Sequence, residues 1–474
     1  MRPFDLLARS GSKSGAYAAI MGVSAFAIVL ALPPGGVGMG VGSFWWIALA
    51  STAVLGCLVC SAGPWSATGA YAAVFWCFHF GLIAVVGIGL VQPADMSLWD
   101  QSWALGPFAA DAALVSLAGS MAFASGAAWV YAWRHAPPDR RFAATSRAGD
   151  HPHGTAGSLL VFATIGLWCA VVAVTSGLGG FFGSYAEYLQ ATSELSVIVS
   201  GVWLGLGCGI VLAVTGRDGW MRTSAIAAFA GVALVALPLG LRGEIMFPSI
   251  AAVVASARCG RVLSWRKACA LVAGLLVLIP VIREVRSTGL QGLPDMAMEL
   301  RLFDAFVEMG GSLHPVEKVV RWQAEGDPLD RGGSYWAPIE RAAARILPGL
   351  VSTAAEDDMR IMNVLVTDRV GAIGFSPVAE AYRNFGAAGV VVVLGLLGAA
   401  LAGIDKVADR QIAALAIATL YVPLLTNVRN SFVSVPVQCA LGVLFVLVLV
   451  AMRHVSSSVL SRPYARPSYV RSKV

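Results

Sequence analysis

The chain has 474 residues, of which 57% are hydrophobic and 13% are charged, and its mean hydropathy is +0.74. This composition excludes a water-soluble globular domain and indicates an integral membrane protein. The apolar runs are continuous and about 20 residues long, which predicts spanning helices rather than the short alternating strands of a barrel. The formal net charge is +6, but the sequence contains no nucleic-acid-binding module, so no nucleic-acid partner is expected.

Twelve stretches have the length and hydropathy of transmembrane helices. The first follows Arg2, Arg9 and Lys13 and is too long for a signal-peptide core, so we expect it to be retained. In chain order the spans are predicted at roughly 15 to 33, 42 to 61, 69 to 91, 106 to 132, 156 to 176, 194 to 215, 223 to 240, 243 to 258, 266 to 284, 384 to 404, 410 to 427 and 431 to 452. The expected fold is an all-α, polytopic membrane protein.

Basic residues predict the orientation of these spans, because Lys and Arg in short loops stay on the cytoplasmic side. With a cytoplasmic N-terminus, the basic loops all lie inside, and the segments VQPADMSLWDQSW and GLGGFFGSYAEYLQATSE, which lack Lys and Arg, lie outside. Both termini are therefore expected in the cytoplasm. This gives four parts: spans one to nine in 1–284, an extracytoplasmic loop in 285–383, spans ten to twelve in 384–452, and a basic cytoplasmic tail in 453–474.

Some arginines are predicted outside, where the charge bias of membrane proteins disfavours them. A ligand or a structural role is the better explanation for such residues than chance. They are Arg242 between spans seven and eight, Arg283 and Arg286 where span nine ends, several within the long loop, and Arg429 between the last two spans. The alternatives are an ion pair of Arg242 with Glu244, and snorkelling of Arg283 and Arg286 to lipid headgroups.

The long polar connection after span nine is too long for a bare loop and is expected to carry short helices. Candidates are 295–309, which could lie flat on the bilayer, together with 315–324 and 336–346. The intervening GDPLDRGGS lacks the lysine and spacing of a phosphate-binding loop and is interpreted as a plain turn. Tyr335 and Trp336 could stack on a sugar or anchor the loop in the membrane interface.

The stretch GFSPVAEAYRNFG, residues 374–386, predicts the start of a helix that continues into span ten. Ser376 is a suitable N-cap, and the following proline suits the first helical position. Glu380, Arg383 and Asn384 then share one face at i, i+3 and i+4. Further along, Gly395, Ala399 and Gly403 form a ridge of small residues that is expected to pack within the bundle.

A set of exterior arginines with nearby carboxylates suits an anionic, lipid-linked substrate, because guanidinium groups bind phosphate through paired N–H bonds. Attack of a sugar hydroxyl on an anomeric carbon needs a base, for which Glu380 is the candidate. Its structural alternatives are a favourable interaction with the helix dipole and an ion pair with Arg383. Other candidate bases are Asp304, His314, Asp357 and Asp358.

Metal ligation and disulfide chemistry are not indicated. The sequence has no DxD motif and no His, Cys and Asp cluster with metal-ligand spacing, so metal independence and the absence of a cofactor are expected. The eight cysteines lie in or beside apolar spans. Cys57 and Cys60 form a CxxC that is interpreted as a pair of small buried hydrophobes.

The block GFSPVAEAYRNFGAAGV resembles the signature of the bacterial oligosaccharide repeat-unit polymerases, the Wzy-type O-antigen and exopolysaccharide polymerases. The segment LRGEIMFPSI resembles the R-G turn of this family, and GGSYWAPIERAAARILPG resembles its G-x-S-Y segment with the following helix and proline. The resemblance implies a fold of the glycosyltransferase C type in the cytoplasmic (inner) membrane. It also implies an extracytoplasmic active site that joins undecaprenyl-diphosphate-linked oligosaccharides into a polysaccharide.

Carried onto this chain, the resemblance implies a metal-independent site in which arginines hold the diphosphate. The implied catalytic residues are Glu380, Arg242, Arg286 and Arg369. The residues expected to bind substrate are Arg283, Tyr335, Arg360, Tyr382, Arg383, Asn384 and Arg429; of these, the resemblance itself implies Tyr382, Arg383 and Asn384. Membrane lipids, a chain-length regulator and a flippase are expected partners. Two alternatives stay open: a ligase that transfers a lipid-linked glycan to another acceptor, and a twelve-helix transporter of an anionic or amphipathic solute.

Overall fold

A computed structural model describes residues 11–31, 40–92, 101–133, 153–217, 219–264, 266–270, 273–274, 282, 303–344, 354–371 and 373–460. Within these ranges the regular structure is helical, with no strand. This agrees with the all-α prediction. The chain is a multi-span membrane protein: six of its described helices are long and apolar enough to cross a bilayer, and three shorter apolar helices accompany them.

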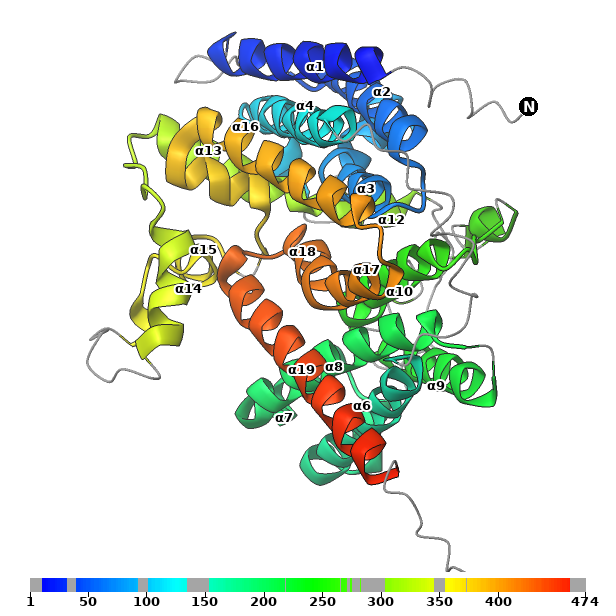
Figure 1. Ribbon diagram of the computed structural model, residues 1–474. Coiled ribbons are helices and arrows are strands. Elements are labelled where there is room, and N and C mark those ends of the chain that lie inside the picture. The colour runs from blue at the N-terminus through cyan, green and yellow to red at the C-terminus, as the bar shows by residue number, and fades with distance from the viewer. Residues whose placement is uncertain are drawn as a thin grey trace, which may run out of the picture.

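The helices form two groups, which Figure 1 shows at opposite sides of the molecule. The first group contains α1 (Gly11–Ala31), α2 (Phe44–Ala62), α3 (Ala67–Gly87), α4 (Ala109–Trp133) and α16 (Pro377–Lys406). The second contains α6 (His153–Ser176), α7 (Tyr185–Ala191), α8 (Ser196–Thr215) and α9 (Trp220–Ala236). Between them lie α10 (Arg242–Arg258), α17 (Arg410–Ala416) and α18 (Val422–Asn427), while α19 (Val435–Leu460) runs along the second group.

Most predicted spans coincide with a helix of the structure. The six long candidates are Val41–Ala62, Ala67–Gly87, Ala109–Trp133, His153–Ser176, Ser193–Thr215 and Pro377–Lys406. The shorter apolar helices are Tyr17–Ala31, Trp220–Ala236 and Phe432–Val448. The predicted eighth span is α10, which has only 17 residues and contains Pro248. The predicted ninth span lies largely outside the described residues.

The predicted eleventh span is a helix with a local irregularity. Five residues, Ile417–Tyr421, form a π-helix between α17 and α18. Such wide turns insert into α-helices and often occur at functional sites. Here the π-helix packs against α8 and α19, so it lies in the interior of the bundle.

Close contact between α4 and α16 joins the first group and is made possible by glycine. A Cβ on Gly126 would overlap the carbonyl oxygen of Gly395 and approach the backbone N of Ala399. A Cβ on Gly398 would overlap the carbonyl of Phe123. Gly395 and Ala399 therefore pack within the bundle, as expected of small residues between membrane helices, whereas a Cβ on Gly403 would meet no atom within 4 Å.

Gly126→Ala is expected to lower the free energy of unfolding by about 1–3 kcal/mol, because a methyl group must separate α4 from α16. A thermal-unfolding assay in detergent would measure the loss. Gly166→Ala is the control, since its added Cβ meets no atom within 4 Å. Equal melting temperatures for the two variants would contradict this description of the contact.

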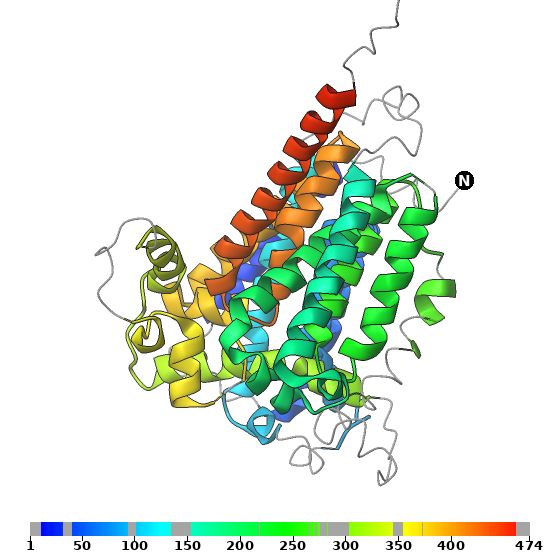
Figure 2. The same cartoon turned by 90° about the horizontal axis from the view of Figure 1, so that it is seen from below.

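The long connection between the ninth and tenth predicted spans carries short helices. They are α12 (Asp304–Met309), α13 (His314–Ala324), α14 (Gly333–Ala344) and α15 (Met362–Arg369). In Figure 2, α12 and α13 (lime) cross one end of the bundle, opposite the C-terminal end of α19. In both views α14 and α15 lie to one side of the main bundle. The helices predicted around 315–324 and 336–346 are confirmed, and of 295–309 only the part from 303 is described.

Helix α16 begins where the sequence predicts and bends shortly afterwards. The Ser376 side chain accepts a hydrogen bond from the Ala379 N–H at 3.1 Å, which confirms the N-cap. Gly386, ten residues after this N-cap, adopts φ 68° and ψ −162°, a conformation that only glycine tolerates readily. The bend separates the first turns, which carry Glu380, Arg383 and Asn384, from the long apolar remainder.

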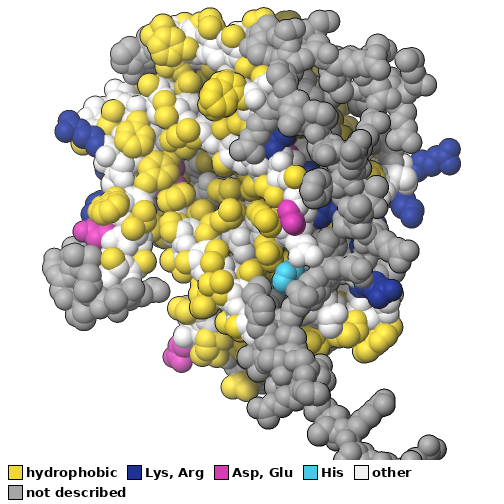
Figure 3. All heavy atoms as spheres, in the orientation of Figure 1, with side chains coloured by type: hydrophobic (Ala, Val, Ile, Leu, Met, Phe, Trp, Pro, Cys, Tyr) yellow, Lys and Arg dark blue, Asp and Glu magenta, His cyan; other side chains and the backbone are white. Residues whose placement is uncertain are grey.

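The exterior of the bundle is largely apolar. Hydrophobic side chains cover most of the described surface in Figure 3, and most Lys and Arg side chains lie near its margins. Exposed apolar residues such as Val174, Val197 and Leu234 belong to the candidate membrane helices. This is the surface expected where lipid rather than water surrounds the protein.

Candidate functional site

Glu380 lies at the centre of a polar cluster in the first turns of α16. Its side chain is fully buried. One carboxylate oxygen accepts a hydrogen bond from the Ser334 hydroxyl at 2.7 Å, and the other accepts one from the Phe432 N–H at 2.6 Å. Glu380 therefore joins the start of α14 to the segment that leads into α19. The alternative in which Arg383 pairs with Glu380 is wrong, because Arg383 pairs with other carboxylates.

Asn384 strengthens the same junction one turn later. Its amide oxygen accepts from the Gly332 N–H at 2.9 Å, and its amide nitrogen donates to the Ser334 hydroxyl at 2.7 Å. The amide nitrogen also donates to the carbonyl of Glu380 at 2.8 Å. Asn384 is fully buried, so its amide group has no contact with solvent water, and these bonds supply its hydrogen-bond partners.

The bend at Gly386 explains how the segment 327–332 is attached to α16. A break in a helix leaves carbonyls of the preceding turn without their usual partners. The carbonyls of Arg383 and Asn384 accept instead from the N–H groups of Asp330 and Arg331, at 3.1 and 3.0 Å. The sequence GDPLDRGGS is thus an ordered part of the cluster rather than a plain turn.

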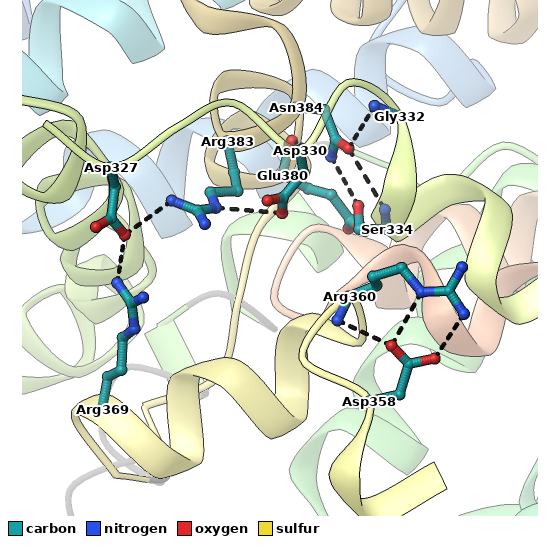
Figure 4. Close-up of polar contacts among 10 residues, drawn as sticks. All are labelled: Asp327, Asp330, Gly332, Ser334, Asp358, Arg360, Arg369, Glu380, Arg383 and Asn384. Carbon is teal, nitrogen blue, oxygen red and sulfur yellow. Dashed lines mark hydrogen bonds and ion pairs between the residues drawn. The ribbon is translucent and has the colours of Figure 1, made fainter. Parts of the chain in front are cut away.

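Arg383 and Arg369 converge on the same segment, as Figure 4 shows. The Arg383 side chain contacts Asp327 at 3.1 Å and Asp330 at 3.2 Å, and Arg369 pairs with the same oxygen of Asp327. Arg369 also lies over the ring of Trp322, 5.0 Å from its centroid. Burial raises the pKa of Asp327, but the hydrogen bonds and charges of the two arginines outweigh it and hold that pKa below its usual value.

Two further arginines lie close in sequence to the residues that bind Glu380, and neither pairs with a carboxylate among the described residues. Arg331 is exposed and precedes Ser334 by three positions; Arg429 is exposed and precedes Phe432 by three positions. Arg331 has φ 51° and is the only described non-glycine residue with positive φ. This conformation is strained, and such strain occurs preferentially at functional sites. Arg429 is held by its backbone, since its carbonyl accepts from the Phe375 N–H at 3.1 Å.

Three helix N-termini meet at the Glu380 carboxylate. Glu380 is in the first turn of α16, Ser334 is the second residue of α14, and Phe432 opens the short 3-10 helix that continues into α19. Each N-terminus presents backbone N–H groups and the positive end of a helix dipole. These dipoles point their positive ends toward the Glu380 side chain, which already accepts a hydrogen bond from the Phe432 N–H.

Aromatic rings cover one side of this meeting point. Tyr335 stacks on Phe385 at a centroid distance of 6.2 Å and meets Phe432 edge-on at 5.1 Å. Burial raises the pKa of the Tyr335 hydroxyl well above its usual value, so it is a neutral donor at physiological pH. Its oxygen has no hydrogen-bond partner in the described part of the chain. Tyr382 is half-buried on the same first turns of α16.

Arg360 belongs to a neighbouring but separate cluster. Its guanidinium binds both oxygens of Asp358 at 3.0 Å and reaches Glu340 at 2.8 Å, while Arg341 pairs with Asp358 at 2.7 Å. Figure 4 shows the Arg360–Asp358 pair apart from the contacts around Glu380. The cluster fastens α14 to the segment before α15. Arg360 is thus engaged by protein carboxylates rather than left available.

The Asp358 cluster makes stability depend on acid. Hydrogen bonds from Arg360, assisted by Arg341 and opposed by burial, hold the pKa of Asp358 at about 2. An aspartate has a pKa of about 3.9 in the unfolded chain. Because the pKa is lower in the folded state, the ionised Asp358 stabilises the fold at pH values above about 3.9. This contribution is expected to be constant near neutrality and to disappear as pH falls from about 4 to about 2. Melting temperatures of wild type and Asp358→Asn should converge at low pH; a constant gap would contradict the assignment.

The other predicted arginines do not join Glu380 in one described pocket. Arg242, the first residue of α10, pairs with Glu308 of α12. Arg283 and Arg286 lie outside the described residues. A shared pocket of Arg242, Arg286 and Arg369 stays a prediction, because Arg286 is not among the described residues. The described geometry brings Arg369 and Arg383 together through Asp327.

The candidate bases fall into different environments. His314 stacks on Trp103 at 4.7 Å, and burial with nearby Lys318 and Arg321 lowers its pKa to about 3. Asp357 is exposed, Asp358 is held by arginines, and the side chain of Asp304 lies outside the described residues. Glu380 has both oxygens engaged and no exposed surface.

Sequence reasoning missed Asp327, Asp330, Arg331 and Ser334. Asp330 lies beside Glu380 in Figure 4, and its side chain is 19% exposed with one oxygen bound to Arg383. The available signal was three charged residues within a short Gly- and Pro-containing stretch. Their proximity to Glu380 depends on the bend at Gly386, which local sequence patterns do not predict.

The described cysteines and potential metal ligands form neither disulfides nor a metal-binding group. Cys57 and Cys60 are exposed on α2 rather than buried, because α2 lies at the edge of the bundle and buries only a third of its span. All described cysteines are free. Among the residues that the structure describes, no group of three or more His, Cys, Asp and Glu side chains is placed to hold a metal ion.

Comparisons with known proteins agree with the resemblance in the sequence. Residues 155–458, which contain the whole cluster around Glu380, match the family model described as O-antigen polysaccharide polymerase Wzy. Protein CapE of Staphylococcus aureus is 25% identical over 253 residues, 53% of this chain. The chain spans about half, 56%, of the length of that relative.

No solved structure matches the chain significantly. The family model nevertheless covers well over half of the sequence and includes helices of both groups. The chain therefore belongs to the family of O-antigen polysaccharide polymerases, Wzy.

Proposed function

We propose that this chain is a membrane glycosyltransferase that polymerises polyprenyl-diphosphate-linked oligosaccharide repeat units on the outer face of the cytoplasmic membrane. The proposed fold has twelve spans of the glycosyltransferase C type. Both termini lie in the cytoplasm in this proposal, and the 285–383 loop lies outside. Family membership supports it, and the basic loops favour this orientation. Under this topology the start of α16 faces the substrate side.

The observation that carries the proposal is the meeting of three helix N-termini at Glu380, with Arg331 three positions before Ser334 and Arg429 three positions before Phe432. Neither arginine pairs with a carboxylate in the described part of the chain. Guanidinium groups and the positive ends of helix dipoles together suit a diphosphate, which carries negative charge on several oxygens. We infer that Arg331 and Arg429 bind this diphosphate. Arg369 and Arg383 hold Asp327 and Asp330 in place beside it.

The reaction is a displacement at an anomeric carbon. The acceptor hydroxyl oxygen forms the new glycosidic bond, the bond from that carbon to the diphosphate oxygen breaks, and the lipid diphosphate leaves with the electron pair. The hydroxyl proton passes to a base. Asp330 fits this role better than Glu380, because Asp330 is partly exposed and keeps one oxygen free of the Arg383 contact. Glu380 is then a positioning residue that holds the segments of Arg331 and Arg429 together.

The direct test is polymerisation by the purified protein in liposomes that contain only lipid-diphosphate-linked repeat units. A ladder of products that differ by one repeat unit is expected. If the lipid-linked glycan were transferred only after a different acceptor had been added, the protein would be a ligase instead. Solute uptake by the same liposomes, undiminished in Glu380→Gln, would identify a transporter. Addition of a chelator is expected to leave the ladder unchanged, and a chain-length regulator and a flippase remain the proposed protein partners.

Arg331→Ala and Arg429→Ala should each reduce kcat/KM about 10- to 100-fold, the loss expected for one charge-assisted hydrogen bond of about 1.5–3 kcal/mol. Neither guanidinium pairs with a described carboxylate, so folding should be preserved. Product formation against substrate concentration would give the ratio. Arg217→Ala, at an exposed position next to α8, is the matched control. Wild-type kcat/KM in both arginine variants would remove the diphosphate site from this position.

A further inference from the structure

Helix α14 exposes apolar side chains on one face only. Trp336 is 60% exposed and Ile339 is 44% exposed, whereas Ala337 is fully buried and Ser334 and Pro338 are buried. The two exposed residues are three positions apart and therefore point the same way. Part of this helix packs on the protein, and its other face, defined here by Trp336 and Ile339, has no protein partner in the described chain.

The charged residues of α14 do not interrupt this face. Glu340 pairs with Arg360 at 2.8 Å, and Arg341 pairs with Asp358 at 2.7 Å. Both pairs are directed toward the segment that precedes α15. The charges are thus neutralised within the protein, so they need not face solvent. A helix with an apolar exposed face and internally paired charges suits a nonpolar surrounding better than water.

The exposed face of α14 continues a lipid-facing strip of α16. Phe385, Val392 and Leu396 of α16 are 43%, 60% and 66% exposed; Val392 and Leu396 lie four positions apart beyond the bend at Gly386, and Phe385 lies just before it. Phe385 stacks on Tyr335, which precedes Trp336 by one residue. The contact between Phe385 and Tyr335 therefore connects the exposed apolar residues of α16 with those of α14. Figures 1 and 2 both place α14 beside the bundle rather than across its end.

We propose that the Trp336 and Ile339 face of α14 is immersed in the acyl chains of the lipid leaflet that adjoins the Glu380 cluster. The continuity with α16 selects lipid over a protein partner, because α16 is a membrane span whose exposed strip contacts acyl chains. Trp336 has the amphipathic ring that favours the region between headgroups and acyl chains. Helix α14 is then the wall between the bilayer and the polar cluster, and a lipid-linked substrate meets it on entering.

The contact can be measured without any assay of activity. The full-length protein, carrying the photoreactive amino acid p-benzoylphenylalanine at position 336 or 339, is reconstituted in phosphatidylethanolamine and phosphatidylglycerol liposomes and irradiated. Mass spectrometry of the protein then detects covalent lipid adducts. Position 392 is the positive control on α16, and position 325, exposed in the turn after α13, is the aqueous control.

Lipid adducts at 336 and 339 with the abundance found at 392, and their absence at 325, would support the proposal. Adducts at 336 and 339 no more abundant than at 325 would overturn it. Cross-links from 336 and 339 to a second copy of the chain in place of lipid would also overturn it, and would identify an interface between copies. Because lipid contact requires no turnover, these results are independent of whether the chain polymerises glycans.

Discussion

Asp330→Asn is expected to lower kcat by about 10²- to 10⁴-fold, the usual contribution of a general base. The replacement keeps an oxygen that can accept from Arg383 and preserves the size of the side chain. It removes the negative charge that, in the proposed reaction, receives the proton of the acceptor hydroxyl. KM for the lipid-linked donor should change little, because Arg331 and Arg429, the proposed diphosphate ligands, are retained. Initial rates of ladder formation over a range of substrate concentrations measure both constants.

The control for this variant is Asp368→Asn, which removes a carboxylate from an exposed position on α15. Its kcat should equal that of the wild type. If Asp330→Asn kept full kcat while Glu380→Gln lost it with KM unchanged, the base would be Glu380, as the sequence motif alone suggests. The dependence of kcat on pH separates these outcomes further, since loss of the base should remove the acidic limb of the profile.

Glu380→Gln is expected to reduce kcat and to raise KM together, with a combined loss in kcat/KM of at least about 100-fold. The carboxylate accepts from the Ser334 hydroxyl and from the Phe432 N–H, and an amide can accept through one of its two atoms only. A buried N–H or hydroxyl left without an acceptor costs about 1–3 kcal/mol. The segments that carry Arg331 and Arg429 should therefore separate, and diphosphate binding should weaken.

Hydrogen exchange provides a readout that a purely chemical role would not change. The amides of the segments 330–334 and 429–434 should exchange faster in Glu380→Gln than in the wild type. Glu325→Gln, at an exposed position after α13, should leave both exchange and turnover unaltered. Unchanged exchange in Glu380→Gln, with lost turnover, would contradict the positioning role and favour direct participation in the reaction.

The membrane helices were largely predictable because lipid imposes a simple requirement. A spanning segment must satisfy its own backbone and expose apolar side chains, so length and hydropathy identify it. The helix cap at Ser376 was predictable for a similar reason, since capping is local chemistry. The count of twelve stays a prediction: α10 is short, the ninth span lies largely outside the described residues, and the eleventh contains a π-helix.

The candidate site was predictable only in part. Glu380, Arg383 and Asn384 were identified from helical spacing, and the structure places all three in one polar cluster. Their partners were not, because Asp327, Asp330 and Ser334 reach them across about fifty positions of sequence. That approach depends on carbonyls freed by the bend at Gly386. The partner of Arg242, Glu308, is likewise distant in sequence and was not predicted, and the role of Arg242 in the site stays a prediction.

The junction of the three helix starts has a consequence for turnover. Under the proposed function, the helix dipoles are the same before and after transfer of the sugar, so they should attract the released polyprenyl diphosphate as they attract the donor. Escape of that carrier, rather than glycosidic bond formation, should then set the pace of each cycle. A rapid first turnover followed by a slower steady rate, and inhibition by added polyprenyl diphosphate, would be the kinetic signs of this arrangement.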